Sequence, residues 1–242
     1  MSGGYEMYAG RSDEEALALL AATAYGHLTA LAPGAASLGP SFVHYAPRPA
    51  EREIWVHLAN TNPLLAALEA EPRAILTVSG PAAYIPSHWS SSPYGVPTSY
   101  YSWALFEVEA ALLRAPEEIL AVLKAMLERF QPEGDHPAVD PADPLWQKMV
   151  GAITGLRLSI RGVRSRFKYG QNRSAAVREG VVHNLQKRGG PQDGPVARYV
   201  LELMGAGKDG TGENAAGKNA AGKNAADGET MDAARDGKGA GR

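Results

Sequence analysis

The sequence of 242 residues contains no cysteine, which excludes disulfides, thiolate zinc sites, iron–sulfur clusters and cysteine nucleophiles. It has no run of about 18 apolar residues, which a membrane helix would need. Its first residues are polar and glycine-rich, unlike a signal peptide. The formal charge at pH 7 is −2, so no general basic field attracts the chain to nucleic acid. We therefore expect a soluble, cytoplasmic protein without a membrane anchor.

The end of the chain lacks aromatic residues altogether. From Gly205 onward the sequence is rich in Gly, Ala and Asn, and Ala-Ala-Gly-Lys-Asn recurs around residues 215–224. Such a segment cannot bury enough apolar surface to offset the entropy lost on ordering. We expect a folded domain over residues 1–204 and a disordered low-complexity tail over residues 205–242.

The stretch Ile54–Leu68 predicts a strand that runs directly into a helix, because a period-two pattern is followed by an apolar helical face. Asn60 or Asn62 can cap that helix, and Pro63 suits its first position. Free N–H groups at a helix start favour an anion such as a phosphate or a carboxylate. His57 lies beside this start and is a possible metal ligand. The alternative is an ordinary helix start with His57 as an ordinary sheet residue.

Further strands and helices are expected on both sides of this stretch. Alternation predicts strands at residues 28–31, 41–46, 74–78, 100–113 and 155–161. We expect Gly80-Pro81 to end the strand at residues 74–78. Residues 163–169 are expected to return as the hairpin partner of 155–161. Apolar faces and capping residues predict helices that begin near Ser12, Pro116, Asp143 and Ser174, and a short last helix at 195–204. About six strands with peripheral helices favour a small antiparallel barrel, a fold mainly β with α.

Residues 84–98 form a loop of Ser, Pro and Gly that carries Tyr84, Trp89 and Tyr94. Its length and aromatic content make it a candidate lid over a binding site. A packed surface loop would show the same composition, so both interpretations stay open.

Several motifs, in the same order and at similar spacing, resemble the PaiB family. They lie between residues 7 and 204 and comprise Met7-Tyr8, Asp13–Glu15, Val43–Pro47, His57–Pro63, Gly80–Ile85, Val96–Thr98 and Lys168–Arg173. The resemblance implies a split β-barrel of the FMN-binding type, which usually forms a homodimer with cofactor clefts at the subunit interface. Members are commonly labelled FMN-binding negative transcriptional regulators. Another branch consists of haem-dependent piperazate synthases, which close an N–N bond in N5-hydroxyornithine.

The chain departs from the family pattern at three places. The usual Thr-Trp-Asn-Tyr is Thr98–Tyr101 here, and the Val-His-Val-x-Gly strand becomes Leu105–Glu109, without its histidine. The Lys-Leu-Ser-Gln pattern is Lys168–Gln171. We expect a cleft reshaped for another ligand, which weakens the regulator label.

If the cofactor is FMN, its phosphate needs cations and N–H donors. The candidates for the phosphate are Lys168, Asn172, Arg173 and the turn from Asn60 to Asn62, and Gln171 belongs to the same motif as the first three. Tyr84 or Trp89 would cover the flavin ring.

If the cofactor is haem b, a histidine is expected to bind the iron, since the chain has no cysteine. His57 is the first candidate and His44 the second, because both lie on strands that the family uses to build its cleft. His27, His88, His136 and His183 have the settings of ordinary surface residues. Arg173 or Lys168 would then hold the carboxylate of a small-molecule substrate.

Three functions remain open at this point. The first is a haem- or FMN-dependent redox enzyme of the piperazate synthase type, the second a non-enzymatic FMN-binding regulator, and the third a barrel that binds nothing and serves as a dimeric partner. The basic clusters are Arg161, Arg164, Arg166 and Lys168 on the late strands and Lys187-Arg188 at a helix end. Neither has a helix-turn-helix pattern around it, so direct DNA binding is disfavoured.

Overall fold

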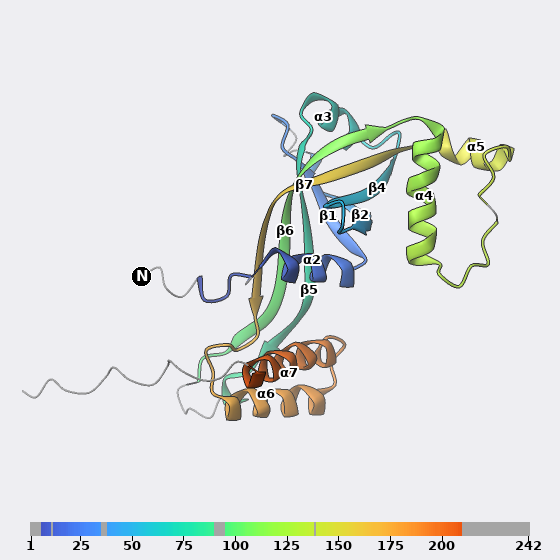
Figure 1. Ribbon diagram of the computed structural model, residues 1–242. Helices are drawn as coiled ribbons and strands as arrows, with labels where there is room; N and C mark the ends of the chain where they lie inside the picture. Colours follow the sequence, from blue (N-terminus) through green and yellow to red (C-terminus); the bar gives the residue numbers. More distant parts are fainter. Residues whose placement is uncertain (1–5, 11, 35–37, 90–94, 138, 210–242) are drawn as a thin grey trace, which may run out of the picture.

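The computed structural model describes residues 6–10, 12–34, 38–89, 95–137 and 139–209. In these residues one antiparallel sheet has the strand order β2-β1-β5-β6-β7-β4-β3 (Figure 1). Its strands are β1 (Tyr25–Ala30), β2 (Ser41–His44), β3 (Ala46–Arg48), β4 (Glu53–Ala59), β5 (Arg73–Ile85), β6 (Thr98–Leu113) and β7 (Ile153–Lys168). The helices are α2 (Asp13–Ala22), α3 (Leu64–Ala70), α4 (Pro116–Phe130), α5 (Pro144–Val150), α6 (Ala175–Arg188) and α7 (Asp193–Asp209), with a 3-10 turn η2 at Ser87–Trp89. In this part of the chain, no helix has both the length and the apolarity that crossing a membrane requires.

A single residue closes the sheet into a barrel. β2 and β3 form the two opposite edges of the sheet, yet only Tyr45 separates them in the chain. The two edges must therefore meet at Tyr45, whose side chain is fully buried. Its hydroxyl donates a hydrogen bond to the carbonyl of Leu20 and shares a second one with Thr23, at 3.0 and 2.6 Å, so this buried polar group is satisfied.

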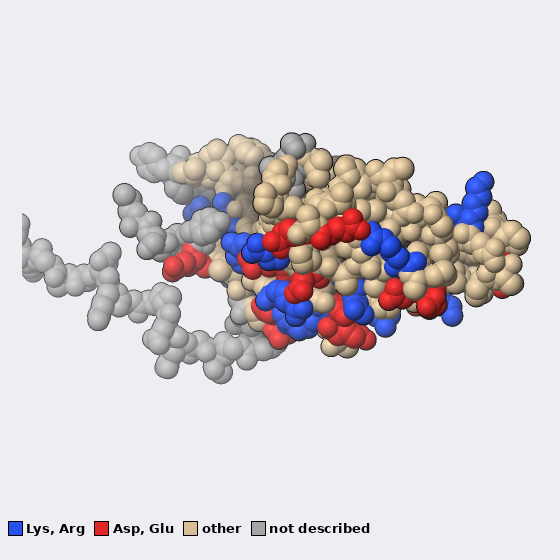
Figure 2. Space-filling view, turned by 90° about the horizontal axis from the view of Figure 1, so that it is seen from above, with Lys and Arg blue, Asp and Glu red and all other residues tan. Residues whose placement is uncertain are grey.

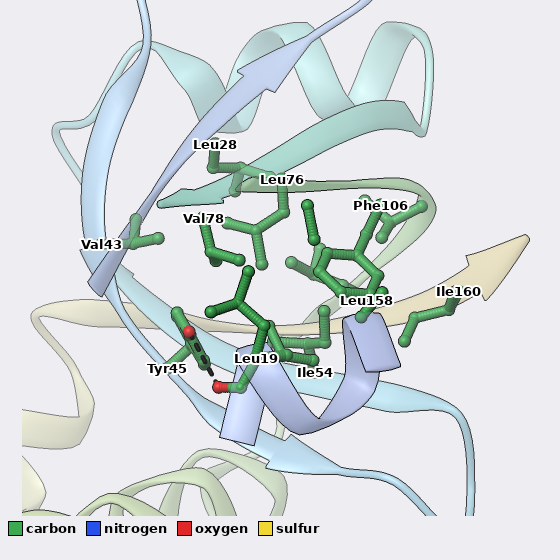
Figure 3. Close-up of a cluster of buried hydrophobic side chains, with 14 of the residues drawn as sticks. Leu19, Leu28, Val43, Tyr45, Ile54, Leu76, Val78, Phe106, Leu158 and Ile160 are labelled. Atoms are coloured by element: carbon green, nitrogen blue, oxygen red, sulfur yellow. Dashed lines mark hydrogen bonds between the residues drawn. The ribbon is translucent and has the colours of Figure 1, made fainter. Parts of the chain in front are cut away.

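The barrel interior is filled by the inward-facing residues of the alternating strands. Figure 3 shows these side chains converging from several strands and from α2. The labelled core residues are Leu19, Leu28, Val43, Tyr45, Ile54, Leu76, Val78, Phe106, Leu158 and Ile160, all of them buried. The expected alternation of β2 and β4 is confirmed, because Val43, Ile54 and Val56 point inward while the neighbouring residues point outward.

β5 does not end at Gly80-Pro81, and the prediction of a break was wrong. The strand continues to Ile85 through a bulge between Ser79 and Ala82. A Cβ on Gly80 would lie 2.1 Å from the hydroxyl oxygen of Ser102, so only glycine allows the backbone to approach β6 this closely. The proline lacks an N–H and is tolerated because the bulge takes it out of the regular ladder.

The predicted hairpin at 155–169 is also wrong, because β7 is one strand of 16 residues. It pairs with β6 from Gly155 to Lys168, and the pairing shifts by one residue opposite Glu107 and Val108. Gly162 lies at this shift, where a Cβ would be 2.9 Å from the carboxylate of Glu107. A glycine between two alternating segments can mark a bulge as well as a turn. Here it marks a bulge, because β6 pairs with β7 on both sides of Gly162.

The predicted helix starts near Ser12, Pro116, Asp143 and Ser174 are confirmed. Ser12, Asp143 and Ser174 accept hydrogen bonds from the N–H groups of Glu15, Leu145 and Val177, as N-caps do. α7 is longer than expected, since it begins at Asp193 and runs to Asp209, beyond the predicted domain boundary at residue 204. Residues 210–242 lie outside the described part of the chain, so the disordered tail stays a prediction.

The helices cover opposite ends of the long strands. α4 packs against the outer face of the sheet, where Val122, Ala125 and Met126 meet Ala46 and Leu113. α6 and α7 pack against each other at the far end of β5 and β7 (Figure 1). The long strands of the sheet thus separate the region around α4 from the region around α6 and α7.

Candidate functional site

His44 and His57 lie side by side on the outer face of the barrel. Their ring centroids are 4.8 Å apart and the rings meet edge to face. His44 also meets Phe130 of α4 edge to face at 5.5 Å. His57 pairs with Gly155 of β7, where a Cβ would crowd Leu113 and Val122, so this glycine lets α4 approach the sheet beside the histidines. The structure therefore brings together the two residues that the sequence proposed as iron ligands.

Both imidazoles are held in the neutral form. Burial lowers the pKa of His44, and burial followed by the neighbouring His44 lowers the pKa of His57 to about 4. The Nδ1 atom of His57 is buried, and among the described residues nothing forms a hydrogen bond with it. A neutral imidazole is the form that binds metals. In the described residues, no group of three or more His, Asp or Glu side chains could hold a metal ion.

An apolar cavity of about 300 Å³ adjoins His44 between α4 and α5. Its lining consists of His44, Leu123, Met126, Leu127, Phe130, Gln131, Trp146 and Met149. The apolar face of α4 forms one side of this cavity, and Met126 on that face is buried. Phe130 is instead 37% exposed and faces the histidine. The lining presents an apolar surface together with the imidazole of His44, a combination that suits a macrocycle held by a histidine. His57, whose Nδ1 is unpartnered, lies beside His44 but is not among the described residues that line this cavity.

A second, cationic pocket of about 130 Å³ lies at the other end of β7. It is lined by Tyr8, Val96, Pro97, Thr98, Tyr100, Lys168, Gly170, Asn172 and Arg173. The Lys168 ammonium donates to the hydroxyl of Thr98 at 2.7 Å and lies 5.6 Å from the centre of the Tyr8 ring. A volume this small suits a phosphate or a carboxylate rather than a whole flavin. Three predicted cofactor residues, Lys168, Asn172 and Arg173, are thus united here.

Gln171 does not line this pocket. Its side-chain oxygen accepts a hydrogen bond from the Tyr169 N–H, and its side-chain nitrogen donates to the carbonyl of Phe167. These bonds fix the turn that ends β7. The structure therefore shows a structural role for Gln171, and contact with a cofactor stays a prediction.

Asn60 and Asn62 are also engaged within the protein. Asn60 donates to the carbonyl of Gly151 at 2.9 Å and accepts from the hydroxyl of Thr154 at 2.7 Å. The side-chain oxygen of Asn62 accepts from the N–H of Leu64 at 2.9 Å, the donor that an anion at this helix start would use. The turn borders a cavity of about 660 Å³. The side-chain amides of Asn60 and Asn62 at its border already form hydrogen bonds within the protein.

Tyr84 and Trp89 are both tied to Arg188 of α6. The guanidinium donates to the carbonyl of Tyr84 at 2.9 Å and lies 4.8 Å from the centre of the Trp89 ring. It also forms a two-pronged ion pair with the buried Asp193 at 2.6 and 2.8 Å. The start of the proposed lid is therefore fastened to α6 and α7, and residues 90–94 of that loop lie outside the described residues.

The two groups of candidate residues are far apart within one chain. His57 pairs with Gly155, and Lys168 lies thirteen residues further along the same strand. At about 3.3 Å per residue this is roughly 40 Å along β7. One cofactor could contact both groups only where two copies of the chain meet.

Comparisons with known proteins agree with this fold. The sequence model of the family described as "Putative FMN-binding domain" matches residues 5–162. Protease synthase and sporulation protein PAI 2 of Bacillus subtilis (strain 168) is 29% identical over 150 residues, which cover 61% of this chain and 70% of that protein.

Two solved structures are similar at the level of the fold. The flavocytochrome Anf3 from Azotobacter vinelandii has a TM-score of 0.54 and 19% identity, and the match covers 68% of this chain and 71% of that one. The FAD and heme binding protein from Mycobacterium smegmatis has a TM-score of 0.51 and 17% identity, covering 67% and 74%. Together with the matched family model, these findings show that the chain belongs to the FMN-binding-domain family of PaiB and folds as a split β-barrel, mainly β with α.

Proposed function

We propose that this protein binds haem b at the His44–His57 pair and catalyses the closure of an N–N bond in a small hydroxylamine such as N5-hydroxyornithine. The observation that supports the proposal most strongly is the pair of neutral imidazoles, whose ring centroids are 4.8 Å apart, beside an apolar cavity. The similarity to a flavocytochrome and to a FAD and heme binding protein is compatible with either cofactor in this fold.

The lining of the cavity favours haem over FMN at this place. Among the described residues that line it, none is a lysine or an arginine, whereas two are methionines and two are aromatic. A flavin phosphate needs cations and N–H donors, whereas a haem needs an apolar surface and an axial ligand. When bound, haem iron supplies a Lewis-acidic centre that can polarise the oxygen of a hydroxylamine.

The chain's own residues would bind and orient the substrate. Closing the N–N bond joins the α-amine to the hydroxylamine nitrogen while the N–O bond breaks and water leaves, so the reaction needs no external oxidant or reductant. Lys168 and Arg173 suit the substrate carboxylate, because both line one small pocket that presents cationic groups. The apolar wall of α4 and α5 would keep bulk water from the reacting atoms.

The proposal requires a homodimer, since the histidines and the cationic pocket lie at opposite ends of β7. An exposed aromatic patch beside the histidines supports a second copy on this face. Phe42 is 67% and Tyr25 is 53% exposed, and their rings stack at 5.2 Å next to Phe130. Large exposed aromatic side chains in contact with one another mark interaction surfaces. The second copy would place its own Lys168 and Arg173 near the first copy's histidines.

The absorption spectrum of the purified protein, before and after reconstitution with hemin, tests the proposal. A haem Soret band that is lost in His57→Ala or His44→Ala, but kept in His183→Ala on the exposed face of α6, is the expected result. The histidine whose loss abolishes haem retention is the ligand. A protein that stays colourless after reconstitution, or that shows only the two flavin bands, would refute the assignment of haem as the cofactor.

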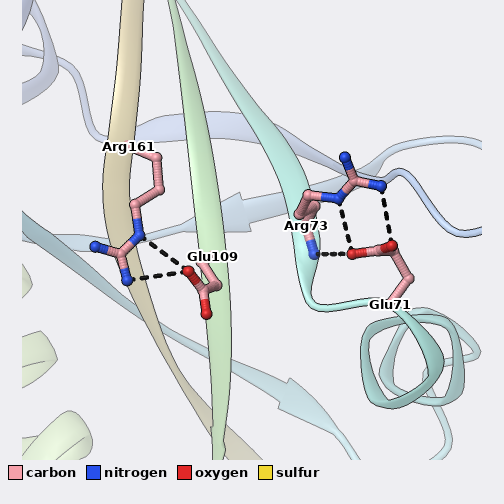
Figure 4. Close-up of polar contacts among 4 residues, drawn as sticks. All are labelled: Glu71, Arg73, Glu109 and Arg161. Atoms are coloured by element: carbon pink, nitrogen blue, oxygen red, sulfur yellow. Dashed lines mark hydrogen bonds and ion pairs between the residues drawn. The ribbon is translucent and has the colours of Figure 1, made fainter.

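An FMN-binding negative transcriptional regulator is the second candidate, because the matched family is described by FMN binding. The charges of the described surface weigh against DNA contact. Arg161 pairs with Glu109 at 3.0 Å (Figure 4), and Arg164 pairs with Glu107 at 2.9 Å, so acidic partners offset the charge of two members of the predicted basic cluster. On the face of the molecule that Figure 2 views, Lys and Arg side chains lie beside Asp and Glu side chains. Retention on DNA with a steep salt dependence would favour the regulator.

A further inference from the structure

The hydroxyl of Tyr100 has no hydrogen-bond partner within the described part of the chain. Its side chain is only 3% exposed and lies at the end of the inward-facing row of β6 that includes Phe106. The buried hydroxyls of Tyr45 and Tyr169, by contrast, each take part in two hydrogen bonds. Because buried polar groups in folded proteins are nearly always hydrogen-bonded, the unpartnered hydroxyl of Tyr100 points to a ligand.

This hydroxyl faces the cationic pocket at the end of β7. Tyr100 and Gly170 both line that pocket, and a Cβ at Gly170 would lie 2.1 Å from the hydroxyl oxygen. The absent side chain therefore leaves the hydroxyl uncovered. The Tyr100 ring meets that of Tyr169 edge to face at 6.3 Å, which fixes its direction. The two residues belong to Thr98–Tyr101 and Lys168–Gln171, two of the stretches in which the chain departs from the family pattern, and these departures meet in one pocket.

The same pocket holds two cations without an acidic partner. The Lys168 ammonium gives one of its three N–H groups to Thr98, and Arg173 is exposed in the turn after β7. Among the described residues that line the pocket there is no aspartate or glutamate. Further back on β7, Arg161 and Arg164 do have carboxylate partners. Two cations beside an unpartnered hydroxyl favour an anionic ligand over a cationic one.

The phenol of Tyr100 can act as a hydrogen-bond donor near neutral pH. Burial raises the pKa of Tyr100, and the positive charge of Arg173 acts in the opposite direction. The influence of Arg173 places its guanidinium near the hydroxyl. Because the pKa stays above its ordinary value, the phenol keeps its proton and can donate it in a hydrogen bond to an anionic oxygen.

We propose that Tyr100 completes an oxyanion site, in which its O–H donates to an oxygen of a carboxylate or phosphate group that Lys168 and Arg173 hold by their charge. The pocket volume of about 130 Å³ suits a group of this size. Gly170 determines its specificity, because a larger side chain there would meet the phenol. The identification of the anion as the substrate carboxylate rests on the proposed function, whereas the site itself needs no haem.

Titration of the haem-free, full-length protein with acetate, and separately with inorganic phosphate, tests the inference at constant ionic strength. The backbone amide NMR signals of residues 168–173 report binding. Saturable shifts with at least one of the two anions are expected. Tyr100→Phe should weaken that binding about tenfold or more, the loss expected for a hydrogen bond to a charged group.

The stability of Tyr100→Phe separates a ligand-binding hydroxyl from a structural one. Its melting temperature without ligand should not fall, because the removed hydroxyl has no partner in the described residues. Tyr199→Phe is the matched control, since it removes the hydroxyl of a half-buried tyrosine that does not line the pocket. This control should leave anion binding unchanged.

The same measurements can overturn the inference. Absence of saturable shifts with both anions, an unchanged affinity in Tyr100→Phe, or a lower melting temperature of that variant without ligand would each refute it. Binding of phosphate but not acetate would support the oxyanion site and contradict the substrate carboxylate of the proposed function. A failure of haem binding would leave these titrations unaffected, because they use haem-free protein.

Discussion

The imidazoles of His44 and His57 lie edge to face with ring centroids 4.8 Å apart, although the two residues come from opposite sides of the sheet order. His44 ends β2, at one edge, and His57 lies on β4, next to the other edge. They meet because Tyr45 joins the two edges and closes the barrel. Two ligand-type side chains are thereby held on paired strands of the sheet rather than on loops, which favours a preorganised site.

The low pKa of His57 predicts a pH-dependent stability. Because its folded pKa is about 4 and its ordinary value is 6.5, the unfolded chain binds more protons between these values. Stability is thus fully present above about pH 6.5 and falls as the pH decreases toward 4. Solvent screening reduces the effect to about 2 kcal/mol. Urea unfolding of haem-free protein at pH 7.5 and pH 5 measures it. His57→Leu should lose most of the difference and His183→Leu should keep it; an equal pH dependence in both variants would contradict the assignment.

Replacing glycine by alanine at two positions should change stability in opposite directions. At Gly80 the new Cβ would lie 2.1 Å from the hydroxyl oxygen of Ser102, in a bulge between long strands, so the substitution should cost about 1–3 kcal/mol. Gly180 lies within α6, and no neighbouring atom is within 4 Å of its Cβ position. There the substitution should stabilise by about 0.5–1 kcal/mol, since alanine loses less entropy in a helix. Chemical denaturation of the two variants provides the comparison, and a neutral Gly80→Ala would show that the bulge is looser than described.

Arg188→Ala should destabilise the unit formed by α6, α7 and the loop after β5. The substitution leaves the carboxylate of Asp193, which is 3% exposed, without its ion-pair partner and uncovers the ring of Trp89. A loss of about 1–3 kcal/mol is expected. Lys187→Ala, at the neighbouring exposed position, is the matched control and should stay within about 0.5 kcal/mol of the unaltered protein. Thermal unfolding followed by tryptophan fluorescence measures the melting temperatures of the two variants. Equal melting temperatures would show that the contacts of Arg188 with Asp193 and Trp89 do not stabilise this unit.

Phe42→Glu should convert the proposed homodimer into monomers. Phe42 is 67% exposed in the single chain, so a charge there hardly affects the monomer fold but would be buried without a partner in a dimer. Analytical ultracentrifugation measures the change. Leu201→Glu, at an exposed position of α7, should leave the oligomeric state as it is. A Phe42→Glu protein that remains dimeric would move the interface to another face.

Sequence patterns determined the elements that local interactions fix. The capping residues Ser12, Asp143 and Ser174 marked three helix starts, and Pro116 with the apolar period that follows it marked the start of α4. These features depend on residues within one or two helical turns, so neighbours in the chain suffice to specify them. Periodicity alone favoured a small antiparallel barrel. The family motifs, in their order along the chain, made the more specific prediction of a split barrel.

Tertiary structure decided what strand register and barrel closure control. Gly80-Pro81 and Gly162 looked like strand ends, but the long partner β6 turned both into bulges within continuous strands. The same continuity of β7 carries Lys168 to the end opposite His57, while closure at Tyr45 brings His44 to it. The sequence thus determined the candidate side chains, and the pairing of distant strands decided which of them meet, because contacts across a sheet depend on partners that no local pattern encodes.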